Sequence, residues 1–186
     1  MQLEELNVMS HIHIPDGVAG NIWWLLVLGY AVVSLFLITI FKRIDREEAG
    51  KKVPLVGIMS AIMLIAMSVP LGFIPFHINL GSLCGIILGP ELGFIAVFVV
   101  NLILAFIGHG GITVVGLNTL IVGVEVFLGS KLYKRFAREG REGISSAMST
   151  FLALVISTVI TFIVIVLITG GSPGTMLFDH HGHGVG

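Results

Sequence analysis

Two histidines lie one residue apart near the start of the chain, within Ser10-His11-Ile12-His13-Ile14-Pro15-Asp16-Gly17. In an extended backbone alternate residues point to the same face, and Pro15 favours an extended conformation for Ile14. Two imidazoles on one face can bind one metal ion, and imidazole suits zinc, copper, nickel and cobalt. Asp16 before Gly17 indicates a turn, and its carboxylate could equally cap the helix that follows. The stretch predicts a metal-binding segment.

Five further histidines lie elsewhere in the sequence. His77 lies between Pro75 and Asn79, and His109 lies among glycines. The other three, His180, His181 and His183, follow Asp179 in the tail, whose composition attracts metals but identifies no site by itself. For each single histidine, the alternative is that a membrane protein has few polar loop positions and histidine collects there by chance. For His77 in particular, the alternative is an interfacial side chain that bonds to the backbone.

The composition places these histidines in a membrane protein. Of the 186 residues, 55% are hydrophobic and only 11% are charged, and the mean hydropathy is +1.04. A soluble domain carries about 25% charged residues. We therefore predict an all-α integral membrane protein, a bundle of about six transmembrane helices of ~20 residues each. The net charge of −1 gives no sign of a nucleic-acid partner.

The apolar segments predict the elements that position the histidines. A metal-binding segment (1–18) precedes a transmembrane bundle (19–170), and a histidine-containing tail (171–186) follows it. Residues 78–88 are too few for a free-standing span, which predicts a short tilted helix or a re-entrant element packed inside protein. Pro54 is expected in the first turn of its helix. The full spans are expected at 20–41, 54–71, 91–107, 112–129 and 147–169.

The basic residues predict the orientation of the bundle. All ten Lys and Arg residues lie in two stretches, 42–52 and 131–142, which we expect to be solvated loops. The positive-inside rule places both stretches in the cytoplasm. Four crossings, or two if 78–107 is a hairpin dipping from outside, can join them. In both cases the N- and C-termini and all seven histidines lie outside the cell.

Other polar residues inside the apolar segments have two readings. Glu125 is the one acidic residue well inside a predicted span, and intramembrane carboxylates are functional candidates. We expect it about one helical turn from the cytoplasmic end, where it could snorkel or pair with Lys131 instead. Asn101 is expected to bond between helices. Gly57 and Ala61 form a small-xxx-small pattern, which favours close approach of another helix of this chain or of a partner.

Three motifs in order resemble those of the CbiM/NikM family, the cobalt- and nickel-specific substrate-binding (S) components of energy-coupling-factor (ECF) transporters. His13-Ile14-Pro15-Asp16-Gly17 resembles the family's N-terminal M-H-I-x-[DE]-G. His77-Ile78-Asn79-Leu80-Gly81-Ser82-Leu83, followed by Ile87-Leu88-Gly89-Pro90, is similar to H-L-x-G-G-x-L with I-L-L-G-P. Gly110-Gly111-Ile112-Thr113, with Gly116 and Asn118, is similar to G-G-[IL]-T-x-x-G-x-N. The motifs cover roughly residues 13 to 120.

The resemblance implies a site and a set of partners. In the family, a near-planar nitrogen site holds the metal between the N-terminal amine, the amide and imidazole of the second residue, and a distant imidazole. Carried over, His13 and His77 are the metal ligands, and Co(II) or Ni(II) is the transported substrate, with no organic cofactor. The implied partners are a transmembrane coupling (T) protein, cytoplasmic ATPase subunits and a small accessory membrane subunit. The implied location is the cell membrane.

Two departures from the family pattern matter. Twelve residues precede His13, and Ile12 replaces the usual Met, so a peptide bond occupies the expected terminal amine. Processing could expose a new terminus, or His11 could replace the amine; translation from Met9 would instead make His11 the third residue of a planar nitrogen site. At the other end, the family's G-E-G-x-[IL] pattern has no counterpart.

These observations predict a metal-capture component of an importer. The sequence has no Walker A motif, nucleophile elbow or cysteine cluster, and we expect no ATPase site and no enzyme activity in this chain. The alternatives are a stand-alone metal-ion channel or secondary transporter, a metal-binding membrane sensor, and an intramembrane metalloenzyme. The last would need a carboxylate at the depth of the histidines, and Glu125 is expected at the opposite face.

Overall fold

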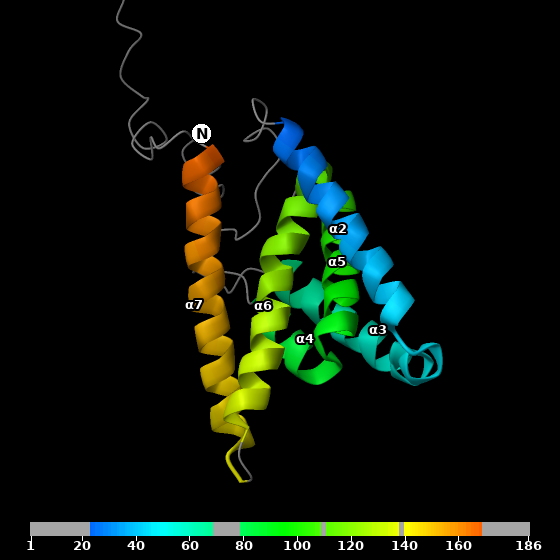
Figure 1. Ribbon diagram of the computed structural model, residues 1–186, viewed down its shortest axis with the longest axis vertical. Helices are drawn as coiled ribbons and strands as arrows, with labels where there is room; N and C mark the ends of the chain where they lie inside the picture. The colour runs from blue at the N-terminus through cyan, green and yellow to red at the C-terminus, as the bar shows by residue number, and fades with distance from the viewer. Residues whose placement is uncertain (1–22, 69–78, 109–110, 138–139, 169–186) are drawn as a thin grey trace, which may run out of the picture.

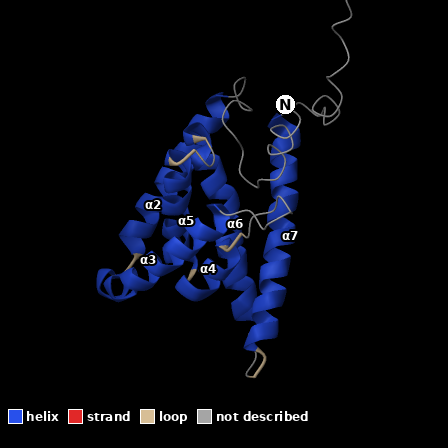
Figure 2. Ribbon diagram, turned by 180° about the vertical axis from the view of Figure 1, so that it is seen from behind, coloured by secondary structure: helices blue, strands red, loops and turns tan. Residues whose placement is uncertain are grey.

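A computed structural model describes residues 23–68, 79–108, 111–137 and 140–168, and every regular element in these ranges is a helix (Figure 1 and Figure 2). Within these ranges, four segments are long and apolar enough to cross a membrane, namely α2, α3, η2 with α6, and α7, and the apolar α5 is shorter. The predicted all-α multi-pass membrane fold is confirmed. The elements are α2 (Trp23–Arg43), α3 (Arg46–Ser68), α4 (Gly81–Leu88), α5 (Pro90–Phe106), the 3-10 turn η2 (Ile112–Val114), α6 (Val115–Phe136) and α7 (Glu142–Ile168).

Helix α6 is the centre of the bundle and contacts α2, α4, α5 and α7. The predicted short element is α4, whose eight residues are mostly buried, as expected for a piece that cannot span a membrane alone. A β-carbon at Gly85 would lie 2.1 Å from the backbone oxygen of Val126, so α4 and α6 touch backbone to backbone. Gly89, with φ at +86°, then turns the chain into α5.

Two further contacts complete the core. Met59, Met63 and Met67 form a buried stripe along α3, and the cluster they belong to includes residues of α4, α5 and α6. On the other side of α6, the rings of Phe36, Phe94 and Phe127 lie with centroids 5.4 to 5.9 Å apart and join α2, α5 and α6. Ring pairs at these separations add to the stabilisation that burial gives.

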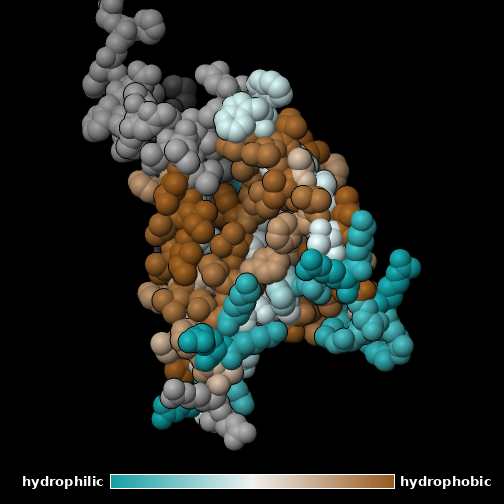
Figure 3. Space-filling view, in the orientation of Figure 1, coloured by the Kyte–Doolittle hydropathy of each residue, from teal (hydrophilic) through white to brown (hydrophobic). Residues whose placement is uncertain are grey.

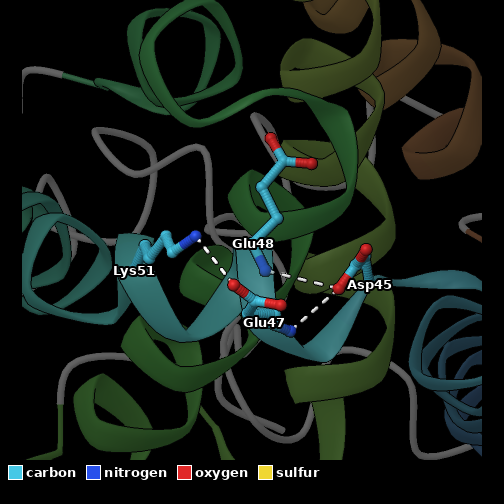
Figure 4. Close-up of polar contacts among 4 residues, drawn as sticks. All are labelled: Asp45, Glu47, Glu48 and Lys51. Atoms are coloured by element: carbon cyan, nitrogen blue, oxygen red, sulfur yellow. Dashed lines mark hydrogen bonds and ion pairs between the residues drawn. The ribbon is translucent and has the colours of Figure 1, made fainter.

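The predicted loop at 42–52 is mostly helical, which is a correction. Helix α3 begins at Arg46 because Asp45 Oδ1 accepts hydrogen bonds from the backbone N–H groups of Glu47 at 2.8 Å and Glu48 at 3.4 Å (Figure 4). Lys51 Nζ then lies 3.0 Å from Glu47 Oε1, one turn back. Pro54 is consequently the ninth residue of α3, not a first-turn residue, and leaves the carbonyl of Gly50 without its usual helical donor.

The second predicted loop, 131–142, is shorter than expected for a similar reason. Helix α6 continues to Phe136 and α7 starts at Glu142. Lys134 and Arg135 lie in the last turn of α6, where positive charge favours the helix dipole. The Ser145 hydroxyl donates to the backbone oxygen of Phe136 at 2.8 Å and ties the two helix ends together.

The two basic segments lie toward the same end of the bundle, where the hydrophilic surface gathers in Figure 3. A pocket of about 210 Å³ is lined both by the α2–α3 junction, including Asp45 and Glu48, and by the α4–α5 turn at Gly89 and Pro90. Helix α4 therefore runs toward the basic end and α5 runs away from it. This arrangement favours the predicted four crossings over a hairpin that dips from the opposite side.

Candidate metal-binding site

The predicted ligands lie outside the described residues. This holds for His11, His13 and His77, and equally for the other four histidines. Within the described ranges, no three His, Cys, Asp or Glu side chains gather in a way that could hold a metal. The ligand set therefore stays a prediction, and the structure informs the elements that flank it.

Asn79, two residues after His77, starts the described part of the second motif. Its Oδ1 accepts a hydrogen bond from the backbone N–H of Gly81 at 2.9 Å. This local turn satisfies one of the free N–H groups at the start of α4. The same bond fixes the amide plane, so that Oδ1 faces the helix and Nδ2 points elsewhere.

Glu125 does not lie one turn from the end of its helix, which is a correction. It is the eleventh of the 22 residues of α6, about 15 Å from either end of the helix. Its side chain is 1% exposed, so it cannot snorkel, and Lys131 is exposed and forms no ion pair with it among the described residues. The expected position took Gly129 as the helix end, whereas charged residues continue α6 for about two more turns.

The Glu125 carboxylate lies beside Asn79 and the α7 residue Ser157. A β-carbon at Gly81 would lie 3.2 Å from both Glu125 Oε2 and Asn79 Oδ1, so the glycine keeps these groups close. The carboxylate thus lies next to Asn79, which follows His77 by two residues in the sequence. The described residues include no histidine, so the argument from depth against a metalloenzyme stays a prediction.

Ser157 belongs to a stripe that the sequence reasoning missed. Four small residues of α7, spaced by four, are all buried. This spacing aligns them on one helix face, and small side chains allow close helix approach in membranes. Next to the stripe, Ser82 Oγ of α4 lies 3.4 Å from Thr150 Oγ1 of α7. The signal was present in the sequence as Ser145-x-x-x-Ser149-x-x-x-Ala153-x-x-x-Ser157.

The third motif has a packing role in the described structure. A β-carbon at Gly116 would lie 2.6 Å from the backbone nitrogen of Tyr30, so this glycine lets α2 contact α6 directly. The Tyr30 hydroxyl donates to the backbone oxygen of Ile112. Asn101 Nδ2 lies 3.3 Å from Thr119 Oγ1 and joins α5 to α6, as expected of an interhelix bond. The motif therefore fixes the start of α6 against its neighbours.

Comparison with known proteins agrees with the motifs. A family model described as the cobalt uptake substrate-specific transmembrane region matches residues 13–179. A protein of Haloquadratum walsbyi, named for metal transport, is 34% identical over 160 residues, which cover 80% of this chain and 69% of that protein. A protein of Methanocaldococcus jannaschii, also named for metal transport, is 31% identical over 80% of this chain and 68% of its own length.

A fused nickel transport protein, NikMN, of Rhodobacter capsulatus is 31% identical over 118 residues, which cover 61% of this chain and 33% of that longer protein. No solved structure gives a significant match. The match to the family model spans α2 to α7 and all three motifs. The chain is therefore a multi-pass membrane protein of the CbiM family of cobalt and nickel uptake proteins.

Proposed function

We propose that this chain is the substrate-capture component of an ATP-driven, ECF-type importer of cobalt or nickel ions. The observation that carries the proposal is the family match, which begins at His13 and includes His77, the two positions of the predicted metal ligands. Relatives named for metal and nickel transport support the same cargo. The metal is the substrate and is captured on the outer face.

The proposed ligands are nitrogen atoms of His13 and His77. The terminal amine of the family site is part of a peptide bond in this chain, and His11 is proposed to replace it. A planar all-nitrogen field suits Ni(II) and can also hold Co(II). The close helix contacts at Gly85 and Gly116 support such a site indirectly, because they fix the parts of α4 and α6 that carry the second and third motifs.

The proposed partners are a T protein, cytoplasmic ATPase subunits and a small accessory membrane subunit. The exposed face of α3 supports a helix-docking partner. Gly57 and Ala61 are both exposed, and a β-carbon at Gly57 would meet nothing within 4 Å. This small-residue face is not used for packing within the described part of the chain, which favours the reading that another subunit approaches it.

A stand-alone channel or secondary transporter is the first alternative. It would need polar groups free to pass an ion between Glu125 and the basic end. Two buried hydroxyls of α7 in this region are instead bonded to backbone oxygens, that of Ser149 to Ser145 at 2.6 Å and that of Ser145 to Phe136 at 2.8 Å. These bonds favour a role of the hydroxyls in helix packing over a role in ion permeation. We therefore infer that the metal ion is released with the help of partner subunits.

Metal titration of the purified chain tests the capture step. Co(II), Ni(II) and Zn(II) are titrated into the parent, His13→Ala and His77→Ala, with Ser149→Ala as a control for loss of a buried hydroxyl. We expect tight Co(II) or Ni(II) binding by the parent and the control, and loss of binding in both histidine variants. If both histidine variants bind as tightly as the parent, the ligand assignment is wrong.

Metal uptake by cells separates an importer from a metal sensor and from a channel. Uptake of radioactive cobalt or nickel is measured in cells that express the chain alone or together with the T protein and the ATPase subunits. We expect uptake only with the partners, and loss of uptake when the ATPase is inactivated. Full uptake by the chain alone would support the channel alternative, and no uptake in either case would support the sensor.

A further inference from the structure

Three buried polar atoms near the centre of the bundle lack hydrogen bonds of standard geometry to any described residue. They are Glu125 Oε2 of α6, Ser157 Oγ of α7 and Asn79 Nδ2 at the start of α4. Glu125 and Ser157 are each 1% exposed. Buried polar atoms without partners are costly, and native proteins rarely keep them. The three atoms therefore call for an explanation.

The three atoms form one complementary set. Asn79 and Ser157 both lie next to the Glu125 carboxylate, and Gly81 leaves the space between Asn79 and Glu125 free of a side chain. An amide N–H group and a hydroxyl are donors, and a carboxylate oxygen is an acceptor. A small rotation of these side chains, or one water molecule held between them, would give each of the three atoms a hydrogen-bond partner.

The chemistry of the set points away from a cation site. An amide nitrogen does not ligate a cation, and the amide oxygen of Asn79 is already bonded to the N–H of Gly81 at 2.9 Å. The set therefore suits a carboxylate that accepts hydrogen bonds from donors on two neighbouring elements. It is presented by α6, the helix around which the bundle packs.

The chain connects this anchor to the predicted metal ligand. His77 precedes Asn79 by two residues, so covalent geometry keeps their Cα atoms within about 7 Å of each other. We propose that Glu125 is a positioning residue for metal capture, which holds Asn79 and thereby the segment that carries His77. The proposal rests on the proposed function, since it assumes that His77 binds the cargo. Groups that orient metal ligands without touching the metal often control affinity.

The test compares Co(II) and Ni(II) affinity, the absorption spectrum of the bound metal and the thermal unfolding of the purified full chain. Glu125→Met removes the acceptor at similar size, Glu125→Gln keeps an acceptor oxygen, and Asn79→Ala removes the anchored amide outside the helices. Ser149→Ala, a buried hydroxyl bonded within α7, is the matched control. The double variant of Glu125→Met and Asn79→Ala measures whether the two side chains act together.

We expect Glu125→Met and Asn79→Ala each to weaken metal binding about 10- to 100-fold. The absorption bands should keep their positions, because the ligands are unchanged. Glu125→Gln and Ser149→Ala should bind close to the parent, and the double variant should be no weaker than the weaker single variant. If Glu125→Met does not fold, Asn79→Ala alone decides the test.

Three results would overturn the assignment. One is parental affinity in Glu125→Met or Asn79→Ala, and another is additive losses in the double variant. The third is a loss of metal affinity in Glu125→Gln that is as large as the loss in Glu125→Met. A parent chain that binds neither Co(II) nor Ni(II) would instead refute the proposed function, and the positioning role with it.

Discussion

Capture by imidazole depends on a nitrogen lone pair that a proton removes at low pH. Histidine in model peptides titrates near pH ~6.5, so lowering the pH through this range protonates free ligands and opposes binding. We predict that the affinity for Co(II) or Ni(II) is constant at neutral pH and falls below about pH 6. Isothermal titration from pH 5 to 8 measures this. Unchanged binding at pH 5 would contradict ligation by His13 and His77.

The residue scale also shows where sequence reasoning stops. The histidine pattern and the motifs identified the family, because ligand types and glycine spacing are local properties of the sequence. The position of Glu125 along α6 could not be read in this way. It depends on where α6 ends, and the apolar run ends near Gly129 although the helix continues to Phe136. Its contacts with Asn79 and Ser157 join residues far apart in the chain and needed the fold.

At the scale of elements, helix spacing is set by glycines at the contacts of α6. Replacing Gly85 by alanine would place a β-carbon 2.1 Å from a backbone oxygen, which no side-chain movement can relieve. We predict that Gly85→Ala destabilises the folded chain by about 3 kcal/mol or more. Thermal unfolding in detergent measures the effect. The control is Gly143→Ala, where a β-carbon meets nothing within 4 Å, and equal melting temperatures of the two variants would contradict the close contact.

The exposed face of α3 leads to a prediction about assembly. Gly57→Leu adds a side chain where the described structure has open space, so we expect unchanged metal affinity and unchanged unfolding. Because the small residues Gly57 and Ala61 would allow another helix to approach closely, we expect weaker co-purification with the T protein. Gly143→Leu, at an open glycine of α7, is the control. Equal recovery of the T protein with both variants would contradict docking at the Gly57 and Ala61 face of α3.

The predicted ends of the helices were the main error of the sequence analysis, and the error has a physical reason. Hydropathy marks where a helix can be in lipid, but a helix can continue into water when charged residues support it. The Glu47 and Lys51 pair, spaced by four, is the local signal for this continuation at the start of α3. The short α4 was predicted correctly because length alone excludes a free-standing span.

At the scale of the whole molecule, polar and small residues distinguish the central helix from the peripheral ones. Helix α6 combines Gly116, Asn118, Thr119, Gly123 and Glu125, and all five are buried. Helix α2 is apolar along most of its length, and only three of its 21 residues are buried. Polar groups in lipid must find partners, so a helix rich in them is expected inside the bundle. This rule could have located α6 from the sequence.

The shared position of the basic segments predicts the topology of the whole chain, which cysteine labelling can measure. Cys84 is buried with 0% exposure, so the parent provides a low background. Lys51 and Lys134 are exposed near the basic end, and Ile112, 48% exposed, lies at the opposite end of α6. In intact cells, we expect a membrane-impermeant maleimide to label Ile112→Cys, and to label Lys51→Cys and Lys134→Cys only after lysis.

Each alternative outcome of the labelling has a distinct meaning. Labelling of Lys51→Cys and Lys134→Cys from opposite sides would contradict the common end that the pocket and the hydrophilic surface indicate (Figure 3). Labelling of both from outside, with Ile112→Cys protected, would keep the bundle but invert it. Inversion would place the start of α6 in the cytoplasm, where capture from the outside by the predicted site is impossible. The orientation of the bundle therefore decides whether the proposed site can serve import.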